Sequence, residues 1–212
     1  MKFFFMSCVF LILFSSGLNA ESVHSDKEFP KRDNKFLIGL DTELFSYMKT
    51  KYRTEGEDGY EDTSSSDSYS SFFGVANLGL RLGGAVKEMF IFGSYLKFSY
   101  NYTDKFEVKS YEFRLSPFFE VSFLKSKIRP FLRGKFDVYL EKMEITGIPY
   151  ASDTKNFTWL LGGSFELGVH FFVASSFSID SSFDIGYSLG KSEKDDVSKF
   201  KTGVIIGFTG WI

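Results

Sequence analysis

Apolar and polar residues alternate along most of the chain from Lys35 onward. In the stretch FIFGSYLKFSYNY, which begins at Phe90, every second residue is large and apolar or aromatic except for one serine. The residues between them include Gly93, Lys97 and Asn101. A period of two is typical of a β-strand whose neighbouring side chains point to opposite faces. Because no helical period interrupts the pattern, we predict an all-β protein.

The alternation predicts eight strands, each with one apolar face and one small, polar or charged face. In the first strand the apolar face is predicted to contain Phe36, Ile38, Leu40 and Leu44. Most connections alternate between short turns and longer polar loops, and the segments 49–70, 143–156 and 190–199 are predicted to be long loops. The predicted strands are 35–48, 71–82, 89–102, 107–123, 128–142, 157–172, 177–189 and 200–212.

Two barrel architectures fit this pattern, and they differ in which face meets water. A lipocalin-like barrel turns its apolar face inward, whereas a membrane barrel turns it toward lipid and fills its lumen with polar side chains. The apolar faces are almost free of charge, the strands reach the roughly 9–11 residues that a tilted crossing needs, and aromatic residues gather near both strand ends. We therefore predict an eight-stranded antiparallel up-and-down transmembrane β-barrel over residues 35–212, closed by pairing of the last strand with the first.

The first twenty residues, MKFFFMSCVFLILFSSGLNA, have the pattern of a secretory signal. Lys2 supplies a positive charge, an apolar core follows at 3–14, and small residues lead to Ala20. The apolar run is about a dozen residues, shorter than the roughly 20 of a membrane-spanning helix. We expect a cleaved signal peptide at residues 1–20 and a flexible periplasmic leader at residues 21–34, which is charged and contains Pro30.

Composition narrows the classes of partner. The 212 residues include 25 Lys and Arg against 27 Asp and Glu, a formal net charge of −2, so no nucleic-acid partner is predicted. The one cysteine, Cys8, lies in the predicted signal, so an exported chain would contain no disulfide. Stability must then come from other interactions.

The pattern resembles a known family of membrane proteins. The stretch FLIGLDTELFSY of the first strand, the stretch GGSFELGVHFFVASSFSIDSSFDIGYSLG of the sixth and seventh strands, and the closing TGVIIGFTGWI are similar to the small eight-stranded bacterial outer-membrane barrels, the OmpA/OmpX/OmpW-like outer membrane protein beta-barrel superfamily. The resemblance covers about residues 35–212 and implies a Gram-negative-type outer membrane as the location. The alternation also predicts that Trp211 faces inward.

The polar faces place charged side chains in the interior of the predicted barrel, where buried charges must pair. A turn at 124–127 would place Phe123 opposite Ile128 and Arg114 opposite Asp137, so we predict an ion pair between Arg114 and Asp137. An eight-stranded barrel is only wide enough for its own side chains, which favours packing as the role of this network over a gated, low-conductance path. The predicted network comprises Glu43, Glu112, Arg114, Glu120, Arg133, Asp137, Glu166 and Asp184.

The candidate motifs for catalysis and metal binding do not match the patterns that these functions require. The stretch GYSLGKS at 186–192 resembles a phosphate-binding loop, but it is one residue short and precedes EKDD rather than an apolar helix. His24 lies in the leader and His170 near the short-turn end, so they form no metal cluster. A lipid hydrolase at the outer interface would need its histidine at the other end of the barrel. We therefore predict no catalytic, cofactor-binding or metal-binding residues and no enzyme.

The function is predicted to reside in surface-exposed loops, in adhesion, host interaction or envelope structure. Expected partners are outer-membrane lipid and a host or matrix ligand bound through the long loops, and a monomer is favoured. A narrow channel or small-solute passage stays open as an alternative, and a lipid-modifying hydrolase is the least favoured. The candidate residues of the acidic first loop are Glu55, Glu57, Asp58, Glu61, Asp62 and Asp67.

Overall fold

The computed structural model describes residues 35–55, 61–71, 76–87, 89–103, 108–123, 126–145, 154–193 and 195–212. The predicted signal peptide and leader lie outside these ranges. None of the described segments forms a helix of the length and apolarity needed to cross a membrane. The strands are β1 (Phe36–Glu55), β2 (Glu61–Ser71), β3 (Ala76–Val86), β4 (Phe90–Thr103), β5 (Val108–Ser122), β6 (Ile128–Ile145), β7 (Thr154–Ala174), β8 (Phe177–Ser192) and β9 (Asp195–Trp211).

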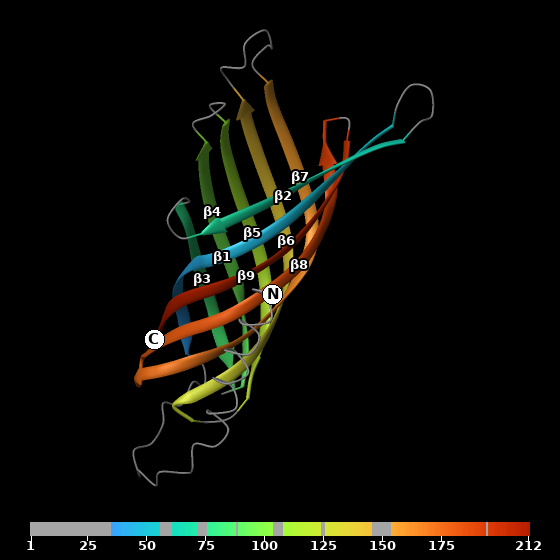
Figure 1. Ribbon diagram of the computed structural model, residues 1–212. Helices are drawn as coiled ribbons and strands as arrows, with labels where there is room; N and C mark the ends of the chain where they lie inside the picture. The colour runs from blue at the N-terminus through green and yellow to red at the C-terminus, as the bar shows by residue number, and fades with distance from the viewer. Residues whose placement is uncertain are drawn as a thin grey trace, which may run out of the picture. The chain divides into compact units, whose positions relative to one another are not determined.

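All strand pairs are antiparallel, and from β3 to β9 each strand lies beside the next one in the chain (Figure 1). The sheet closes into a barrel because β9 pairs with β1, from Leu37 opposite Trp211 to Thr54 opposite Asp195. We call this closed sheet the barrel wall. At the end of this seam the Phe36 amide donates to the Ile212 carbonyl at 2.8 Å, and the Ile212 amide donates back at 2.9 Å. The predicted antiparallel all-β architecture and its closure are confirmed.

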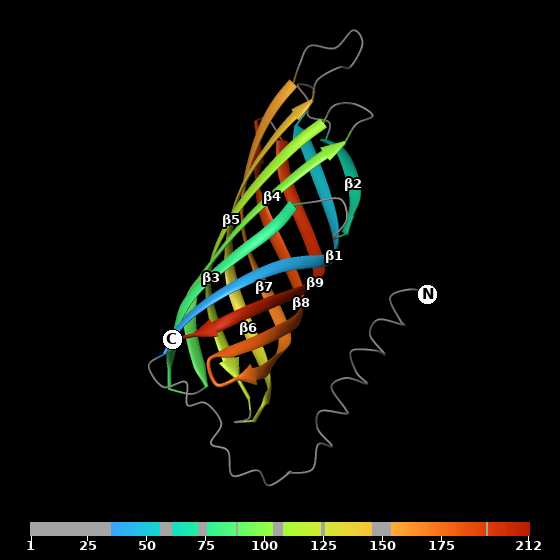
Figure 2. The ribbon, with the colours of Figure 1, turned by 90° about the vertical axis from the view of Figure 1, so that its left-hand side faces the viewer.

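The other edge of β1 has two partners. Its first part, 36–41, pairs with β3, and its second part, 45–55, pairs with β2 (Figure 2). The described residues therefore form nine strands rather than the predicted eight, and the prediction of a loop over 49–70 is wrong. That segment is serine-rich and acidic, and a strand solvated on both faces has no hydrophobic alternation by which to recognise it.

Two other connections at the same end of the barrel as the β1–β2 hairpin are also shorter than predicted. Strands β8 and β9 continue to Ser192 and Asp195, so the predicted loop at 190–199 is a tight turn that includes Glu193 with a φ of 44°. Strands β6 and β7 extend into the predicted loop at 143–156 as far as Ile145 and Thr154. The paired strands therefore extend further along the barrel axis than the alternation of apolar residues predicts.

Side chains alternate between outside and inside along the wall. Phe98 and Leu161 face outward with exposed fractions of 50% and 44%, whereas Arg114 faces inward with 1%. The outward apolar side chains form a continuous surface, which we call the apolar band. Its most exposed members include Phe36, Leu40, Leu78, Phe92, Phe98, Phe136, Phe157, Trp159, Leu161, Phe165, Leu189 and Phe208.

A β-bulge in β1 changes which of its residues face outward. The register against β9 shifts between Glu43 and Phe45, so β1 has one extra residue at this bulge. Glu43 remains buried, and Phe45 takes the next outward position with 55% exposure. The prediction that Leu44 continues the outward apolar face is therefore wrong, because a strict period of two cannot anticipate a bulge.

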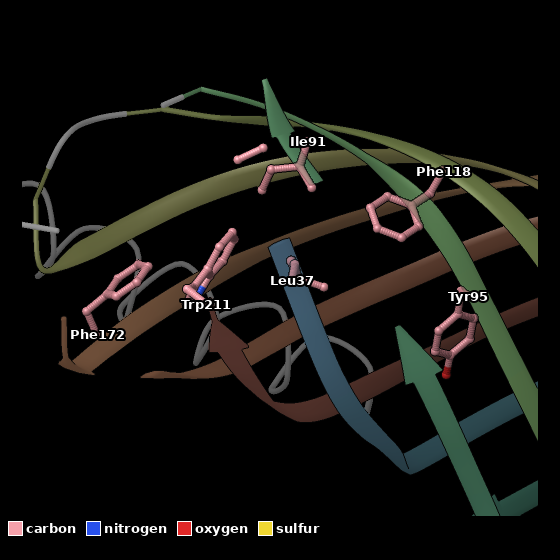
Figure 3. Packing of buried hydrophobic residues seen from close by; sticks show 7 residues of the cluster. Leu37, Ile91, Tyr95, Phe118, Phe172 and Trp211 are labelled. Atoms are coloured by element: carbon pink, nitrogen blue, oxygen red, sulfur yellow. The ribbon is translucent and has the colours of Figure 1, made fainter. Parts of the chain in front are cut away.

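Apolar side chains close the short-turn end of the barrel interior. Leu37, Ile91, Phe118, Phe172 and Trp211 belong to one buried cluster there (Figure 3). The predicted inward orientation of Trp211 is confirmed by its 2% exposure. A second, smaller cluster lies toward the opposite end and comprises Tyr139, Leu160 and Val197, with Tyr52 packed against it.

Interior glycines make room for the large side chains. A Cβ atom at Gly79 would lie 2.2 Å from the Tyr95 hydroxyl, and a Cβ atom at Gly207 would meet the carboxylate of Asp41. Both positions face the interior opposite a bulky neighbour. The absence of a side chain at these sites is therefore a packing requirement.

Candidate functional site

Between the two apolar clusters the interior is filled by paired charges, which we call the ionic network. Its side chains project from all eight strands of the closed barrel, β1 and β3 to β9, and none comes from β2. Most of them are almost completely buried, so each charge depends on its neighbours rather than on water. Its cations are Arg81, Lys97, Arg114, Arg133, Lys135, Lys199 and Lys201. Its other members are Asp41, Glu43, Glu112, Glu120, Asp137, Glu141, Glu166, His170, Asp180 and Asp184. Arg129 is also buried, and its Nε donates to the Ser126 carbonyl at 3.0 Å.

Arg114 and Asp137 meet across β5 and β6. The Nη2 atom of Arg114 lies 2.7 Å from Oδ1 of Asp137, and its Nε donates to the same oxygen at 2.9 Å. Ser116 Oγ also donates to Asp137 Oδ1, at 2.5 Å, and Arg114 Nη2 donates to Ser164 Oγ at 2.9 Å. Hydroxyl groups thus contribute hydrogen bonds to both charged side chains.

The predicted register for this pair is wrong by two residues, although the pair forms. Arg114 lies opposite Tyr139 rather than Asp137, so the contact is diagonal. The reason is the hairpin, in which the Phe123 amide donates to the Pro130 carbonyl at 2.8 Å and Ser122 lies opposite Phe131. The connection is therefore longer than the tight turn at 124–127 that the prediction assumed.

Arg133 occupies the centre of the ionic network. Its Nη2 lies 2.5 Å from Glu120 Oε2, and its Nη1 lies 2.8 Å from Glu166 Oε1. Lys135 continues the chain of charges, with its Nζ 3.1 Å from Glu166 Oε2 and 2.6 Å from Asp184 Oδ1. Two cations and three carboxylates from β5 to β8 are therefore bound into one cluster.

Nearer the short-turn end of the barrel, His170 lies between two carboxylates. Its Nδ1 is 2.7 Å from Asp180 Oδ1 and its Nε2 is 2.8 Å from Glu120 Oε1. Arg81 reaches the same region, with Nη2 2.6 Å from Asp180 Oδ2 and Nε 2.6 Å from Asp41 Oδ2. His170 is completely buried, so it joins two parts of the ionic network.

Toward the opposite end the network uses three lysines. Glu43 lies 2.5 Å from Lys97 Nζ and 2.6 Å from Lys201 Nζ. Lys199 Nζ lies 2.7 Å from Glu141 and 3.5 Å from Glu112. Lys199 was not predicted to face the interior, because the predicted last strand began at residue 200, although Lys199 has the same parity as Lys201.

All eight predicted network residues face the interior, and each has an oppositely charged partner. In contrast, the six predicted loop residues do not form one loop. Glu55 ends β1, whereas Glu61, Asp62 and Asp67 belong to β2. Glu57 and Asp58 lie outside the described residues.

A second candidate site is the part of β1 and β2 that rises above the apolar band, which we call the outer hairpin. Outward positions on β1 change from Phe45 to Lys49, Lys51 and Arg53, and such charges mark the limit of an apolar surface. On β2 the side chains of residues 63–67 are all exposed, so the strand is polar on both faces. The outer hairpin is therefore suited to contact with water and with polar partners.

Charged side chains also mark the edge of the apolar band elsewhere. Lys142 lies exposed on the outside of β6 and forms a pair with half-buried Glu144, with 2.7 Å between Nζ and Oε1. This hydrogen bond raises the pKa of Lys142. The described residues contain no group of three or more His, Cys, Asp and Glu side chains placed to hold a metal ion.

Known structures share this architecture. The outer membrane protein OprG from Pseudomonas aeruginosa aligns with a TM-score of 0.52 and 10% identity, over 88% of this chain and 99% of that chain. The outer membrane protease OmpT from Escherichia coli aligns with a TM-score of 0.50 and 7% identity, over 89% of this chain and 100% of that chain. The chain has the fold of an outer-membrane β-barrel.

At these identities the likeness concerns the barrel fold alone. No protein-family model and no curated protein matches the sequence. Any function of this barrel therefore rests on the residues of this chain.

Proposed function

We propose that this chain is an integral protein of a bacterial outer membrane that presents the outer hairpin at the cell surface as a binding element, in adhesion or in interaction with a host factor. The observation that carries the proposal is the continuation of the wall beyond the apolar band. Lys49, Lys51 and Arg53 replace the aromatic side chains on β1, and the paired residues of β2 are polar and exposed. Residues 45–54 of β1 also pair with β9 as far as Asp195, so this polar extension of the barrel wall, with β2 at its margin, projects into water from a membrane-anchored base.

The ionic network supports a structural role for the interior in the same proposal. Arg114, Arg133 and Asp137 are at most 2% exposed, and each is bound by at least one opposite charge. Side chains held in this way stiffen the wall on which the outer hairpin stands. The working surface is then the outer hairpin rather than the lumen.

The test truncates the outer hairpin, which also removes Tyr52 from the second interior apolar cluster, so heat-modifiable gel migration first shows that each variant is folded. Lys51 lies opposite Ser65, so residues 51–65 are exchanged for an Asn-Gly turn that joins Thr50 to Ser66. As a matched control, residues 146–153 are exchanged for the same turn between Ile145 and Thr154, which are also opposite each other. We expect cells that display the first variant to lose binding to matrix-coated surfaces and to host cells, while the control binds normally. Unchanged binding by the first variant would remove the proposal.

A further inference from the structure

A groove lies on the outer face of the barrel, across the middle of β5, β6 and β7. Its volume is about 470 Å³. Phe165 lies opposite Gly134 and midway along the outward row of β7, so the groove lies at the middle of the apolar band, and we call it the midband groove. Its outward-facing lining residues are Pro117, Phe119, Gly134, Phe136, Gly163 and Phe165.

The two glycines of the midband groove are not required by packing. A Cβ atom at Gly134 would have its nearest neighbour at 3.9 Å, in the Phe165 ring, and a Cβ atom at Gly163 would lie 3.4 Å from the Lys135 carbonyl. Interior Gly79, in contrast, leaves no room for a Cβ atom. Gly134 and Gly163 thus keep a hollow open between phenylalanine rings.

Pro117 interrupts the ladder of hydrogen bonds that borders the midband groove. Strands β5 and β6 pair up to Leu115 opposite Val138 and resume at Phe118 opposite Lys135. Between these pairs the register is unchanged, but positions 116 and 117 form no ladder pair. Proline in the middle of a sheet removes a ladder bond, and it is usually confined to edge strands and bulges. Strand β5 has a neighbour on both sides, so neither explanation accounts for Pro117.

The missing bond leaves the Phe136 carbonyl without its ladder partner. The Phe123 amide donates to the Pro130 carbonyl, so outward residues that lie opposite each other on β5 and β6 exchange backbone bonds. The unchanged register places Pro117 opposite Phe136, where an amide N–H would donate to the Phe136 carbonyl. Because proline has no N–H, this carbonyl receives no hydrogen bond from the described residues of β5. Ser94, an outward hydroxyl beside Pro117, belongs to β4 and lies on the far side of β5.

The position of the Phe136 carbonyl defines the chemistry of a ligand. Hydrocarbon offers no hydrogen-bond donor, so a backbone acceptor left unpaired in the bilayer core carries a large free-energy cost. A ligand that supplies one donor removes this cost. The outward-facing residues that line the midband groove carry no polar side chain, so the rest of the ligand must be apolar and uncharged.

We propose that the midband groove binds a lipid-phase ligand with a hydroxyl group part-way along a hydrocarbon chain, and that this hydroxyl donates to the Phe136 carbonyl. The chain occupies the space left by Gly134 and Gly163, between the rings of Phe119 and Phe165. The hydroxyl must lie about halfway across the roughly 25 Å apolar layer, deeper than the headgroups. This site lies on the membrane-facing base of the protein and does not depend on the outer hairpin.

The test uses the full chain in nanodiscs of dimyristoyl phosphatidylcholine, whose acyl chains carry no hydroxyl group. The ligands are methyl 12-hydroxystearate, whose hydroxyl reaches the depth of the groove, methyl 2-hydroxystearate, whose hydroxyl stays at the interface, and methyl stearate. NMR follows the Phe136 carbonyl carbon and the amides of Gly134 and Gly163. We expect the 12-hydroxy ester to shift the Phe136 carbonyl signal and to bind at least about tenfold more tightly than the other two esters. Absence of binding, equal affinities of the three esters, or binding of the 12-hydroxy ester without a shift of the Phe136 carbonyl signal would overturn the proposal.

Variants of two prolines separate the hydrogen bond from the space. Pro117→Ala restores an amide that donates to the Phe136 carbonyl, so we expect the 12-hydroxy ester to lose its advantage over methyl stearate. Pro130→Ala is the matched control, because Pro130 faces outward on the same pair of strands but lies outside the groove, and it should retain the preference. Heat-modifiable gel migration shows that both variants are folded. A full preference in Pro117→Ala, or an equal loss of preference in Pro130→Ala, would overturn the proposal.

Two further measurements test the space itself and a protein as the donor. Gly134→Leu fills the midband groove, and we expect the folded variant to bind the 12-hydroxy ester at least about tenfold more weakly. Unchanged binding would place the ligand elsewhere and overturn the proposal. A concentration-dependent dimer in detergent micelles that Pro117→Ala abolishes would mean that a second copy supplies the donor, which would also overturn it.

Discussion

The Nη2 atom of Arg114 lies 2.7 Å from Oδ1 of Asp137 in the barrel interior, and neither side chain is more than 1% exposed. Removal of one member of a buried pair leaves the other charge without compensation, which costs about 3–5 kcal/mol. The Arg114–Asp137 pair is therefore a direct measure of how strongly the ionic network holds the wall.

We predict that Asp137→Ala lowers the free energy of unfolding by about 3–5 kcal/mol, because the buried Arg114 guanidinium loses its close carboxylate and keeps only Asp184, at 3.8 Å. Urea titration of the protein in lipid vesicles measures the change. Glu144→Ala is the matched control, since it breaks the pair with exposed Lys142 and is expected to leave the midpoint almost unchanged. Equal, small effects of the two substitutions would mean that the interior charges are hydrated.

Glycine positions on the two faces of the wall should respond differently to alanine. At Gly79 a Cβ atom meets the Tyr95 hydroxyl at 2.2 Å, whereas at Gly134 the nearest atom is Cε1 of Phe165 at 3.9 Å. We expect Gly79→Ala to destabilise the barrel by about 1–3 kcal/mol through overpacking. Gly134→Ala should change stability by no more than about 0.5 kcal/mol. The same urea titration decides, and a larger loss at Gly134 than at Gly79 would contradict the assignment of the faces.

Contact of the apolar band with lipid predicts that the free-energy cost of an outward arginine is largest at the middle of the band and small at its boundary. Phe165 lies midway between the ends of the outward row of β7, whereas Phe157 lies opposite Lys142 at the boundary of the band. We expect Phe165→Arg to cost about 2–4 kcal/mol in vesicles and Phe157→Arg about 0–1 kcal/mol. Similar costs at the two sites would indicate that the outer face is not in contact with hydrocarbon at its middle.

The faces of the barrel were predictable because lipid and a charged interior impose a period of two on every crossing strand. Phe98 and Arg114 were assigned to the correct faces from this period alone. The bulge between Glu43 and Phe45 was not predictable in the same way, since one extra residue exchanges the faces without any change in composition. Lys199 was missed for a similar reason, because the start of β9 is polar and has no apolar alternation.

The outer hairpin was the part of the fold least predictable from the sequence. Ser64, Ser65 and Ser66 belong to a strand, yet serine-rich, acidic sequence has the composition of a loop. Pairing with β1 stabilises the strand, and that contact depends on tertiary structure rather than on local preference. The register at Arg114 likewise depends on a bond between Phe123 and Pro130 that no residue pattern reveals.

The central claim is that apolar side chains contact lipid while the interior is shielded from it, and the two tryptophans test it directly. Trp159 faces outward with 44% exposure, and Trp211 faces inward with 2%. The variants Trp211→Phe and Trp159→Phe each retain one tryptophan, whose fluorescence is measured in vesicles of lipid with brominated acyl chains. Strong quenching of Trp159 and little quenching of Trp211 is the predicted result. Quenching of Trp211 as strong as that of Trp159, or stronger, would contradict the account.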